Sequence, residues 1–314
     1  MLARLQQIIT LGVLAAAVGW LVFFWPTSPA LGLACFMAIA LGYSLFLAIE
    51  FILLKALHGT DPTPAPTWAN VVRAWAGETL AAPQVFCWRQ PFRANAIPDS
   101  VPMPGSGAPG TPPRRGVVFV HGFVCNRGLW TPWLQRLQAR GQPFVAVNLE
   151  PVFGSIEAYA PLIDAAVRRL RDATGLAPVL VCHSMGGLAT RAWLRAGAGA
   201  DEGQAEGDAR VHRVFTIGTP HGGTWLGRFS HVTNGRQMQL GSEWVRALAA
   251  AEPPARAARF TCWYSNCDNI VFPASTATLP GADNRLVPGV AHVALAFCPQ
   301  VMEATLAEID TAPL

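Results

Sequence analysis

One serine in this sequence lies at a corner where chemistry is possible. The stretch VLVCHSMGGLATRAWL (179–194) passes from β-branched residues through small residues into an apolar, helix-like pattern, with Ser184 at the corner. A nucleophile elbow needs such a corner, and its turn is so tight that the residues two before and two after the serine must be small. Gly186 meets this requirement, and Cys182 stands where glycine is usual but is still small. The corner alone leaves open an ordinary strand-to-helix turn.

A serine hydroxyl needs a base and an orienting acid before it becomes a useful nucleophile. His292, in VPGVAHVALAF, follows the last predicted strand, and a loop there can carry its imidazole back over Ser184. Asp268, in YSNCDNIVFP, comes just past the carboxyl end of a predicted strand, where parallel sheets gather their sites. Asp283 is the rival acid, but it precedes its strand and therefore belongs to the opposite edge of the sheet. We expect a triad of Ser184, His292 and Asp268.

An acyl transfer site also needs two backbone N–H groups that bind the developing oxyanion. The residue after the nucleophile, Met185, supplies one of them. The other is expected from Phe123, in the VHGF loop after the first core strand. His121 in the same loop is expected to tie loops together rather than to carry protons. The sequence has no HExxH, paired CxxC or carboxylate cluster, so no metal or cofactor is predicted.

The elements that must position these residues follow one another in a regular order. Strands are predicted over 116–122, 143–149, 177–183, 213–220, 259–266 and 284–289, and helices over 129–140, 155–175, 185–197 and 298–309. This alternation predicts an α/β domain over 114–314 with a mostly parallel, doubly wound sheet. Residues 221–258 break the alternation, and we expect them to form a small lid over the strand ends.

The N-terminal region has a different composition. From Leu5 to Ile49 there is no charged residue, and residues 8–25 and 30–49 are each about long enough to cross a bilayer, which takes roughly 20 helical residues. PTSP (26–29) separates them, so residues 1–55 are predicted to form a transmembrane helical hairpin that contacts the membrane through 8–25 and 30–54. A cleaved signal peptide is disfavoured by the weak n-region and the lack of a small-x-small site.

Charge and composition indicate where the protein is located and which partners it can have. Hydrophobic residues make up 52% of the chain and charged residues 13%, which is too apolar for a purely soluble domain. Arg4 and Lys55 flank the two spans, so the positive-inside rule predicts a two-pass protein of a bacterial inner membrane with a cytoplasmic catalytic domain. The net charge of +4 comes from scattered arginines, which excludes a nucleic-acid partner. Seven cysteines without framework spacing predict free thiols.

Between hairpin and domain, residues 56–113 are predicted to be a connector. It contains an amphipathic run around WANVVRAWAGETL (68–80), one possible edge strand at QVFCWRQPF (84–92) and a linker over 97–116 that is rich in proline and glycine. The acidic, low-complexity stretch 196–210 is expected to be a solvated loop.

Four motifs, in order, resemble the α/β-hydrolase superfamily and within it the bacterial lipases and esterases of the triacylglycerol lipase type. They are VVFVHGF, VCHSMGG, TIGTPHGGT, and the pair YSNCDNIVFP with GVAHVAL. The resemblance covers roughly 114–300 and leaves the hairpin unexplained. It implies the α/β-hydrolase fold with Ser184 as nucleophile, Asp268 as acid, His292 as base, and Phe123 and Met185 as oxyanion donors.

The sequence therefore predicts a membrane-anchored serine hydrolase that cleaves an acyl ester, expected to be lipid-derived, through an acyl-enzyme. Two alternatives of other classes stay open. One is an acyltransferase or thioesterase on the same scaffold, which product analysis with added acceptors distinguishes. The other is a catalytically silent, membrane-bound binding module, which retention of all three triad residue types disfavours.

Overall fold

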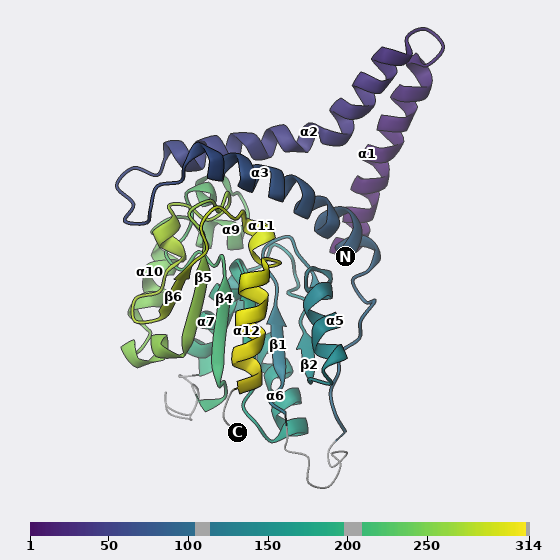
Figure 1. Cartoon of the computed structure of the whole chain (residues 1–314). Helices are drawn as coiled ribbons and strands as arrows, with labels where there is room; N and C mark the ends of the chain where they lie inside the picture. The colour runs from purple at the N-terminus through teal and green to yellow at the C-terminus, as the bar shows by residue number, and fades with distance from the viewer. Residues whose placement is uncertain (104–113, 198–208, 312–314) are drawn as a thin grey trace.

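Short apolar runs of the chain form one parallel sheet in a computed structural model, which describes residues 1–103, 114–197 and 209–311 (Figure 1). Within these residues the sheet has six strands in the order β2-β1-β3-β4-β5-β6. The strands are β1 (Val117–Val120), β2 (Phe144–Ala146), β3 (Val179–His183), β4 (Arg213–Ile217), β5 (Phe260–Tyr264) and β6 (Asp283–Leu286). Residues in β1 and β3 are buried without alternation, as in a strand covered on both faces.

Helices cover both faces of the sheet, which confirms the doubly wound prediction. α6 (Ala160–Thr174) and α7 (Met185–Gly197) pack on one face, in a core that includes Val167 and Leu188. α5 (Thr131–Ala139) and α12 (Pro299–Thr311) pack on the other, around Trp133 and Val301. The strand order reverses between β1 and β3, so their carboxyl ends flank the crevice where ligands bind in such sheets.

The segment between β4 and β5 is helical and firmly attached. It contains η4 (Trp225–Phe229), α9 (Thr233–Gln237), α10 (Glu243–Ala250) and η5 (Pro254–Arg259). The buried Asn234 amide donates to the Val152 carbonyl oxygen (2.8 Å) and the Tyr159 hydroxyl (3.2 Å). These bonds fix α9 to the connection between β2 and α6. That residues 221–258 open and close as a lid stays a prediction.

The two N-terminal helices form a hairpin that projects away from the sheet (Figure 1). They are α1 (Leu2–Phe24) and α2 (Pro29–Ala56), and both are long and apolar enough to cross a membrane by length and composition. The first turns of α1 are docked on the rest of the molecule, because the buried Gln6 amide donates to Gln90 Oε1 (2.8 Å). The rest of α1 and the first half of α2 project away from the sheet (Figure 1).

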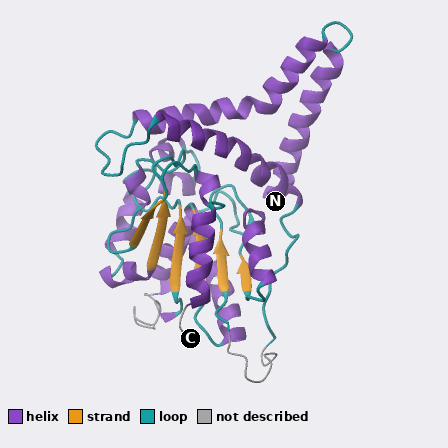
Figure 2. Ribbon diagram, viewed as in Figure 1, coloured by secondary structure: helices purple, strands orange, loops and turns teal. Residues whose placement is uncertain are grey.

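The second half of α2 lies along α3 (Trp68–Pro83), and together the two helices cover the carboxyl ends of the strands (Figure 2). Trp75 Nε1 donates to the Ser44 carbonyl oxygen (2.8 Å), and the Tyr43 hydroxyl donates to the Thr79 carbonyl oxygen (2.6 Å). In a regular helix the N–H of residue 83 would bond that carbonyl, but Pro83 has none. Tyr43 therefore satisfies an acceptor that the proline leaves free.

The strand predicted over 84–92 is wrong. Residues Gln84–Arg89 form a π-helix (η1), and α4 (Gln90–Phe92) continues it. Val85 and Gln90 are both fully buried, and their spacing of five residues matches the π-helical repeat rather than a strand. Packing against the core and α1 overrides the β propensity of valine, phenylalanine and tryptophan here.

Most other predicted bounds differ by a few residues from those observed. The helix predicted over 155–175 begins as the 3₁₀ turn η3 (Ile156–Tyr159) and ends at Gly175, whose φ of 71° stops α6 as expected. Ser155 makes no side-chain cap bond there. Residues 104–113 of the predicted linker and 198–208 of the predicted acidic loop lie outside the described residues.

Candidate active site

Ser184 lies at the sharp turn between β3 and α7. Its φ of 53° is in the left-handed region, which is uncommon for a residue other than glycine and marks a strained turn. The Ser184 N–H donates to the Ile217 carbonyl oxygen (2.9 Å), and its carbonyl accepts from Thr219 Oγ1 (2.8 Å). A Cβ on Gly186 would lie 2.3 Å from the Val120 carbonyl oxygen, so only glycine fits there. The backbone has the form of a nucleophile elbow.

Cys182 fits this elbow because its side chain points away from the tight side of the turn. Its Sγ lies 3.2 Å from Thr190 Oγ1 of α7, and the residue is fully buried. Burial raises the pKa of the Cys182 thiol to about 12. The thiol stays protonated at neutral pH, so Cys182 is not a reactive cysteine.

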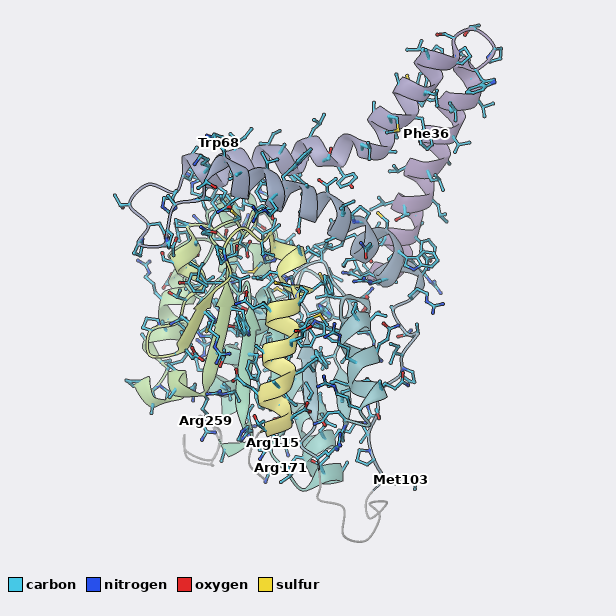
Figure 3. All side chains as sticks on the ribbon, in the orientation of Figure 1. Phe36, Trp68, Met103, Arg115, Arg171 and Arg259 are labelled. Atoms are coloured by element: carbon cyan, nitrogen blue, oxygen red, sulfur yellow. The ribbon has the colours of Figure 1, made fainter. Side chains whose placement is uncertain are left out.

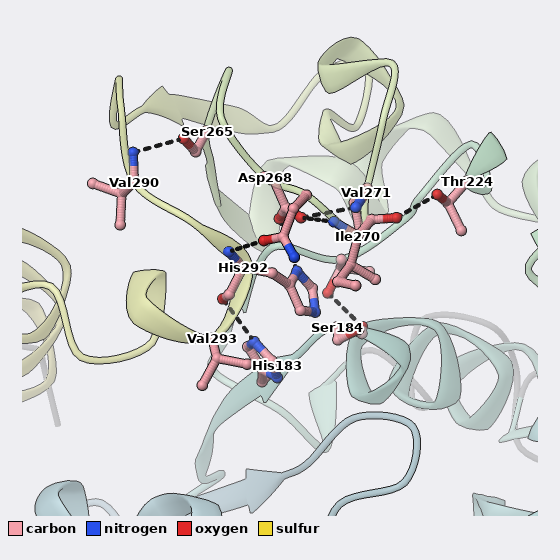
Figure 4. Close-up of polar contacts among 12 residues, drawn as sticks. His183, Ser184, Thr224, Ser265, Asp268, Ile270, Val271, Val290, His292 and Val293 are labelled. Carbon is pink, nitrogen blue, oxygen red and sulfur yellow. Dashed lines mark hydrogen bonds and ion pairs between the residues drawn. The ribbon is translucent and has the colours of Figure 1, made fainter. Parts of the chain in front are cut away.

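Asp268 and His292 form a buried pair at the same edge of the sheet (Figure 4). His292 Nδ1 lies 2.8 Å from Asp268 Oδ2, while Asp268 Oδ1 accepts from the N–H groups of Ile270 (3.0 Å) and Val271 (2.7 Å). Burial lowers the pKa of His292, but the charge and hydrogen bond of Asp268, together with the charge of Glu78, outweigh it and leave the pKa raised.

Gly218 shows how closely Asp268 and His292 approach the strand end that binds the Ser184 backbone. It follows Ile217, the hydrogen-bond partner of the Ser184 N–H. Its φ is 57°, and a Cβ there would lie 2.9 Å from Asp268 Oδ2 and 3.1 Å from His292 Nδ1. Figure 4 shows Ser184 beside the imidazole of His292. The structure thus brings together all three residues predicted as a triad.

The other two predicted site residues flank the serine. Met185 is the first residue of α7, and Phe123 lies in the loop after β1. A Cβ on Gly122 would lie 2.8 Å from Ser184 Cβ, so this loop passes directly against the serine. Phe123 packs edge-on against Phe153 with ring centroids 5.9 Å apart.

His121 holds this loop in place. Its Nε2 accepts from the Leu149 N–H (3.0 Å), so the ring proton is on Nδ1, which donates to the Gly122 carbonyl oxygen (2.9 Å). Burial lowers the pKa of His121 to about 4, so the ring stays neutral and keeps both bonds. Its contacts are those of the structural residue that the sequence predicts.

Asp283 differs from Asp268 in both its position and its surroundings. It is the first residue of β6, at the amino end of the strand, and its half-exposed carboxylate is paired with Arg285. The structure therefore brings Asp268, and not Asp283, to His292.

Three residues that the sequence analysis missed hold the His292 loop. The His292 N–H donates to Asn269 Oδ1 (3.2 Å), and Asn269 Nδ2 donates to Glu50 Oε2 of α2 (2.7 Å). Glu50, Asn269 and Glu78 are all buried. The signal for Glu50 was its position as the first charged residue after an apolar run of 45 residues from Leu5 to Ile49.

Glu78 of α3 binds the loop directly. Its Oε1 accepts from the Val293 N–H (2.9 Å) and its Oε2 from the Ala294 N–H (3.0 Å), in the short helix α11 (His292–Leu295). Burial raises the pKa of Glu78, although the two backbone hydrogen bonds oppose the rise. Its sequence signal was weaker: it is the only acidic residue of the amphipathic run over 68–83.

His183, the residue before the serine, contacts the predicted base. Its ring centroid lies 4.6 Å from that of His292, and its Nε2 lies 3.2 Å from the His292 carbonyl oxygen. Burial lowers the pKa of His183 well below its usual value, so the ring is neutral and Nε2–H donates. Among the described residues, no group of histidine, cysteine and acidic side chains is arranged to hold a metal ion.

Comparisons with known proteins agree on one scaffold. The sequence model of the alpha/beta hydrolase family matches residues 117–309. The mature lipase BlEst2 of Bacillus licheniformis is similar in structure, with a TM-score of 0.54 and 18% identity over 67% of this chain and 96% of its own. Lipase B of Aspergillus fumigatus has a TM-score of 0.53 and 16% identity over 68% of this chain and 56% of its own. No curated protein sequence matches the chain.

Proposed function

The chain belongs to the alpha/beta hydrolase family, and on that premise we propose that it is a membrane-anchored serine ester hydrolase whose nucleophile is Ser184. The observation that carries the proposal is the buried Asp268–His292 pair, with its 2.8 Å contact, beside a serine held at a φ of 53°. An ordinary strand-to-helix turn needs neither the strain nor the pair.

The proposed mechanism gives each residue one role. His292 takes the proton of the Ser184 hydroxyl as Oγ attacks the ester carbonyl carbon, and Asp268 orients the imidazole and stabilises its charged form. The N–H groups of Met185 and Phe123 bind the oxyanion of the tetrahedral intermediate. His292 then returns the proton to the leaving alcohol, and the acyl group remains on Ser184. Water then attacks the acyl carbon while His292 takes its proton, and His292 passes a proton to Ser184 Oγ as the carboxylic acid leaves.

The anchor is the second part of the proposal. α1 and the first half of α2 would cross the membrane as a hairpin, since their outward side chains are large, apolar and exposed; Ile8 is 70% exposed and Phe23 is 70% exposed. Arg4 and Lys55 support a position of both ends, with the catalytic domain, on the cytoplasmic side of a bacterial inner membrane, because positive charges favour that side. An anchored hydrolase of this fold favours lipid-derived esters as substrates.

The activity is tested by comparing the full chain with Ser184→Ala on esters of graded acyl length, alongside labelling with a fluorophosphonate. We expect the wild type to label and turn over esters, and the variant to lose labelling and roughly 10⁶-fold in kcat, as removal of a triad serine does elsewhere. Ser155→Ala, on a surface loop, is the matched control. A wild-type protein that neither labels nor hydrolyses any ester would contradict the proposal.

The orientation is tested with a membrane-impermeant maleimide on intact cells. The thiol introduced by Thr27→Cys in the hairpin turn should react from outside, whereas the exposed native Cys87 should react only after lysis. Reaction of Cys87 in intact cells would place the catalytic domain on the other side of the membrane.

A further inference from the structure

The helix α3 carries an apolar stripe on the side turned away from the sheet. Trp68, Val72 and Leu80 are 59%, 58% and 71% exposed, and Ala76 completes their i, i+4 spacing. The buried residues of α3, among them Glu78, face the opposite way, toward the catalytic domain. Figure 3 shows Trp68 at the outer margin of the two covering helices.

The second half of α2 continues this surface. Four large apolar side chains on its outer side are between 55% and 69% exposed: Leu45, Phe46, Ile49 and Ile52. The residues buried on its other side, Glu50, Phe51 and Leu54, face the catalytic domain. These side chains and those of the α3 stripe are here called the outer face, and soluble monomers rarely expose so many large apolar side chains on two adjacent helices.

Charge is sorted across this layer by sign. Residues 29–93 contain three acidic side chains; Glu50 and Glu78 are buried toward the catalytic domain, and Asp61 is bonded to Thr63 and Ser275. The cationic side chains are arranged differently. Arg73 of α3 is exposed, and the half-buried Lys55 of α2 lies over the ring of Trp68 at 5.0 Å. A surface that is apolar and cationic, with acidic groups turned inward, is complementary to anionic lipid headgroups.

We propose that the outer face lies in the headgroup region of an anionic bilayer, so that α3 and the second half of α2 run along the membrane surface. This inference rests on the proposed anchor, with which the outer face is continuous. Helix α2 has 28 residues and is about 42 Å long, which exceeds the roughly 30 Å of the hydrocarbon core. The surplus of about 12 Å lies in the C-terminal part of α2, which packs on the catalytic domain.

This placement names the substrate class. The inner side of α3 binds the N–H groups of Val293 and Ala294, next to His292, through Glu78. The base is therefore separated from lipid by about one helix diameter, roughly 10 Å. A site so placed takes its ester from the bilayer: the substrate is a membrane lipid ester rather than a water-soluble one.

The depth of the outer face can be measured in the full chain reconstituted into phosphatidylcholine vesicles with and without phosphatidylglycerol. A fluorophore on the thiol introduced by Ala76→Cys reports on the outer face, and one at Ala139→Cys, an exposed alanine of α5, is the matched control. Cys35, Cys87 and the half-buried Cys298 are replaced by alanine in both. We expect quenching of the residue-76 probe by headgroup-region nitroxide lipids and of the control by aqueous iodide. Equal quenching of both probes by iodide would overturn the inference.

A third protein separates this inference from the anchor on which it rests. In a chain with Cys87→Ala and Cys298→Ala, a label on native Cys35 of the hairpin reports on the bilayer interior. Deep quenching at Cys35 with iodide quenching at residue 76 would refute the outer face and leave the anchor intact. Iodide quenching at both would refute the anchor as well, while fluorophosphonate labelling of Ser184 tests the hydrolase independently.

Delivery of substrate through the outer face can be measured separately, as a ratio of two activities. The test variant carries Val72→Glu and Leu80→Glu, and the control carries Gln135→Glu at an exposed position of α5. For each protein, the rate of turnover of an ester in vesicles is divided by the rate of turnover of a soluble ester. Because two apolar side chains that would contact lipid are replaced by carboxylates, we expect this ratio to fall by roughly tenfold or more. An unchanged ratio would contradict delivery of substrate through the outer face.

Discussion

At the scale of single residues, the end of the strand at which an aspartate lies decides whether it meets His292. Asp268 follows β5 and Asp283 begins β6, so two aspartates of the same chemistry lie at opposite edges of one sheet. Strand direction could be predicted from the sequence, and it was sufficient to rank the two. The hydrogen bonds that hold Asp268 could not be predicted, because they depend on the fold of the 268–271 turn.

Replacing Asp268 should cost far more than replacing Asp283. We expect Asp268→Asn to lower kcat on a soluble ester by about 10⁴-fold, because the imidazole loses the acceptor that fixes its tautomer. Asp283→Asn should change kcat less than a few-fold, since its carboxylate pairs only with the surface residue Arg285. Loss of activity in Asp283→Asn alone would transfer the role to that residue.

The activity should depend on pH through His292. Only the neutral imidazole accepts the serine proton, and the raised pKa of His292 means that a higher pH is needed to form it. The acidic limb of kcat/KM should therefore have a midpoint above about 6.5, the ordinary histidine value. Asp268→Asn should move the limb to lower pH. A limb that stays in place in this variant would contradict the assignment.

At the scale of elements, structures encoded by neighbouring residues could be predicted from the sequence. Structures that depend on packing between distant segments could not. Helix α7 has the predicted bounds, and α6 ends at the predicted Gly175, because an elbow and a left-handed glycine are encoded by neighbouring residues. The π-helix η1 was missed because its helical state depends on contacts with α1, such as that of Gln90 with Gln6. The pattern of residues 84–92 does not indicate which distant residues they contact.

The turn that follows α10 is joined to α7 by an ion pair between Glu252 and the buried Arg191. Arg191 is 1% exposed, and it makes three hydrogen bonds to Glu252 and one to the His221 carbonyl oxygen (3.1 Å). Glu252→Ala should lower the free energy of unfolding by about 3–5 kcal/mol, because it leaves the guanidinium buried without its counter-charge. The temperature of thermal unfolding measures the loss of stability, and Glu303→Ala, at an exposed position of α12, is the control. An equal transition temperature in both variants would refute it.

At the scale of the whole molecule, the N-terminal helices belong to the same structural unit as the proposed triad. Glu50 and Asn269 are 219 residues apart in sequence and 2.7 Å apart in space. The hairpin could be predicted from composition alone, and the sheet from alternation. Their junction could not, because a single glutamate at the end of an apolar run does not indicate what it binds.

Removing the charge of Glu78 should therefore affect catalysis at a distance. Glu78→Gln keeps an acceptor for one N–H of α11 but removes a charge that raises the pKa of His292. We expect the acidic limb of kcat/KM to shift to lower pH and kcat to fall roughly ten- to a hundredfold, as small displacements of reacting groups do. Glu303→Gln is the control. A fall in kcat with an unshifted limb would indicate a structural role only.

The contacts of Glu50 and Glu78 also limit how this protein can be re-engineered or diversify. An anchor is usually a detachable module, which recombination exchanges without harm to the enzyme it carries. Here a foreign anchor grafted at residue 84 would bring the hydrolase to the same membrane but leave the backbone around His292 without either carboxylate. Hairpin and hydrolase must therefore be inherited together, and a homologue that loses one is expected to lose or rebuild the other.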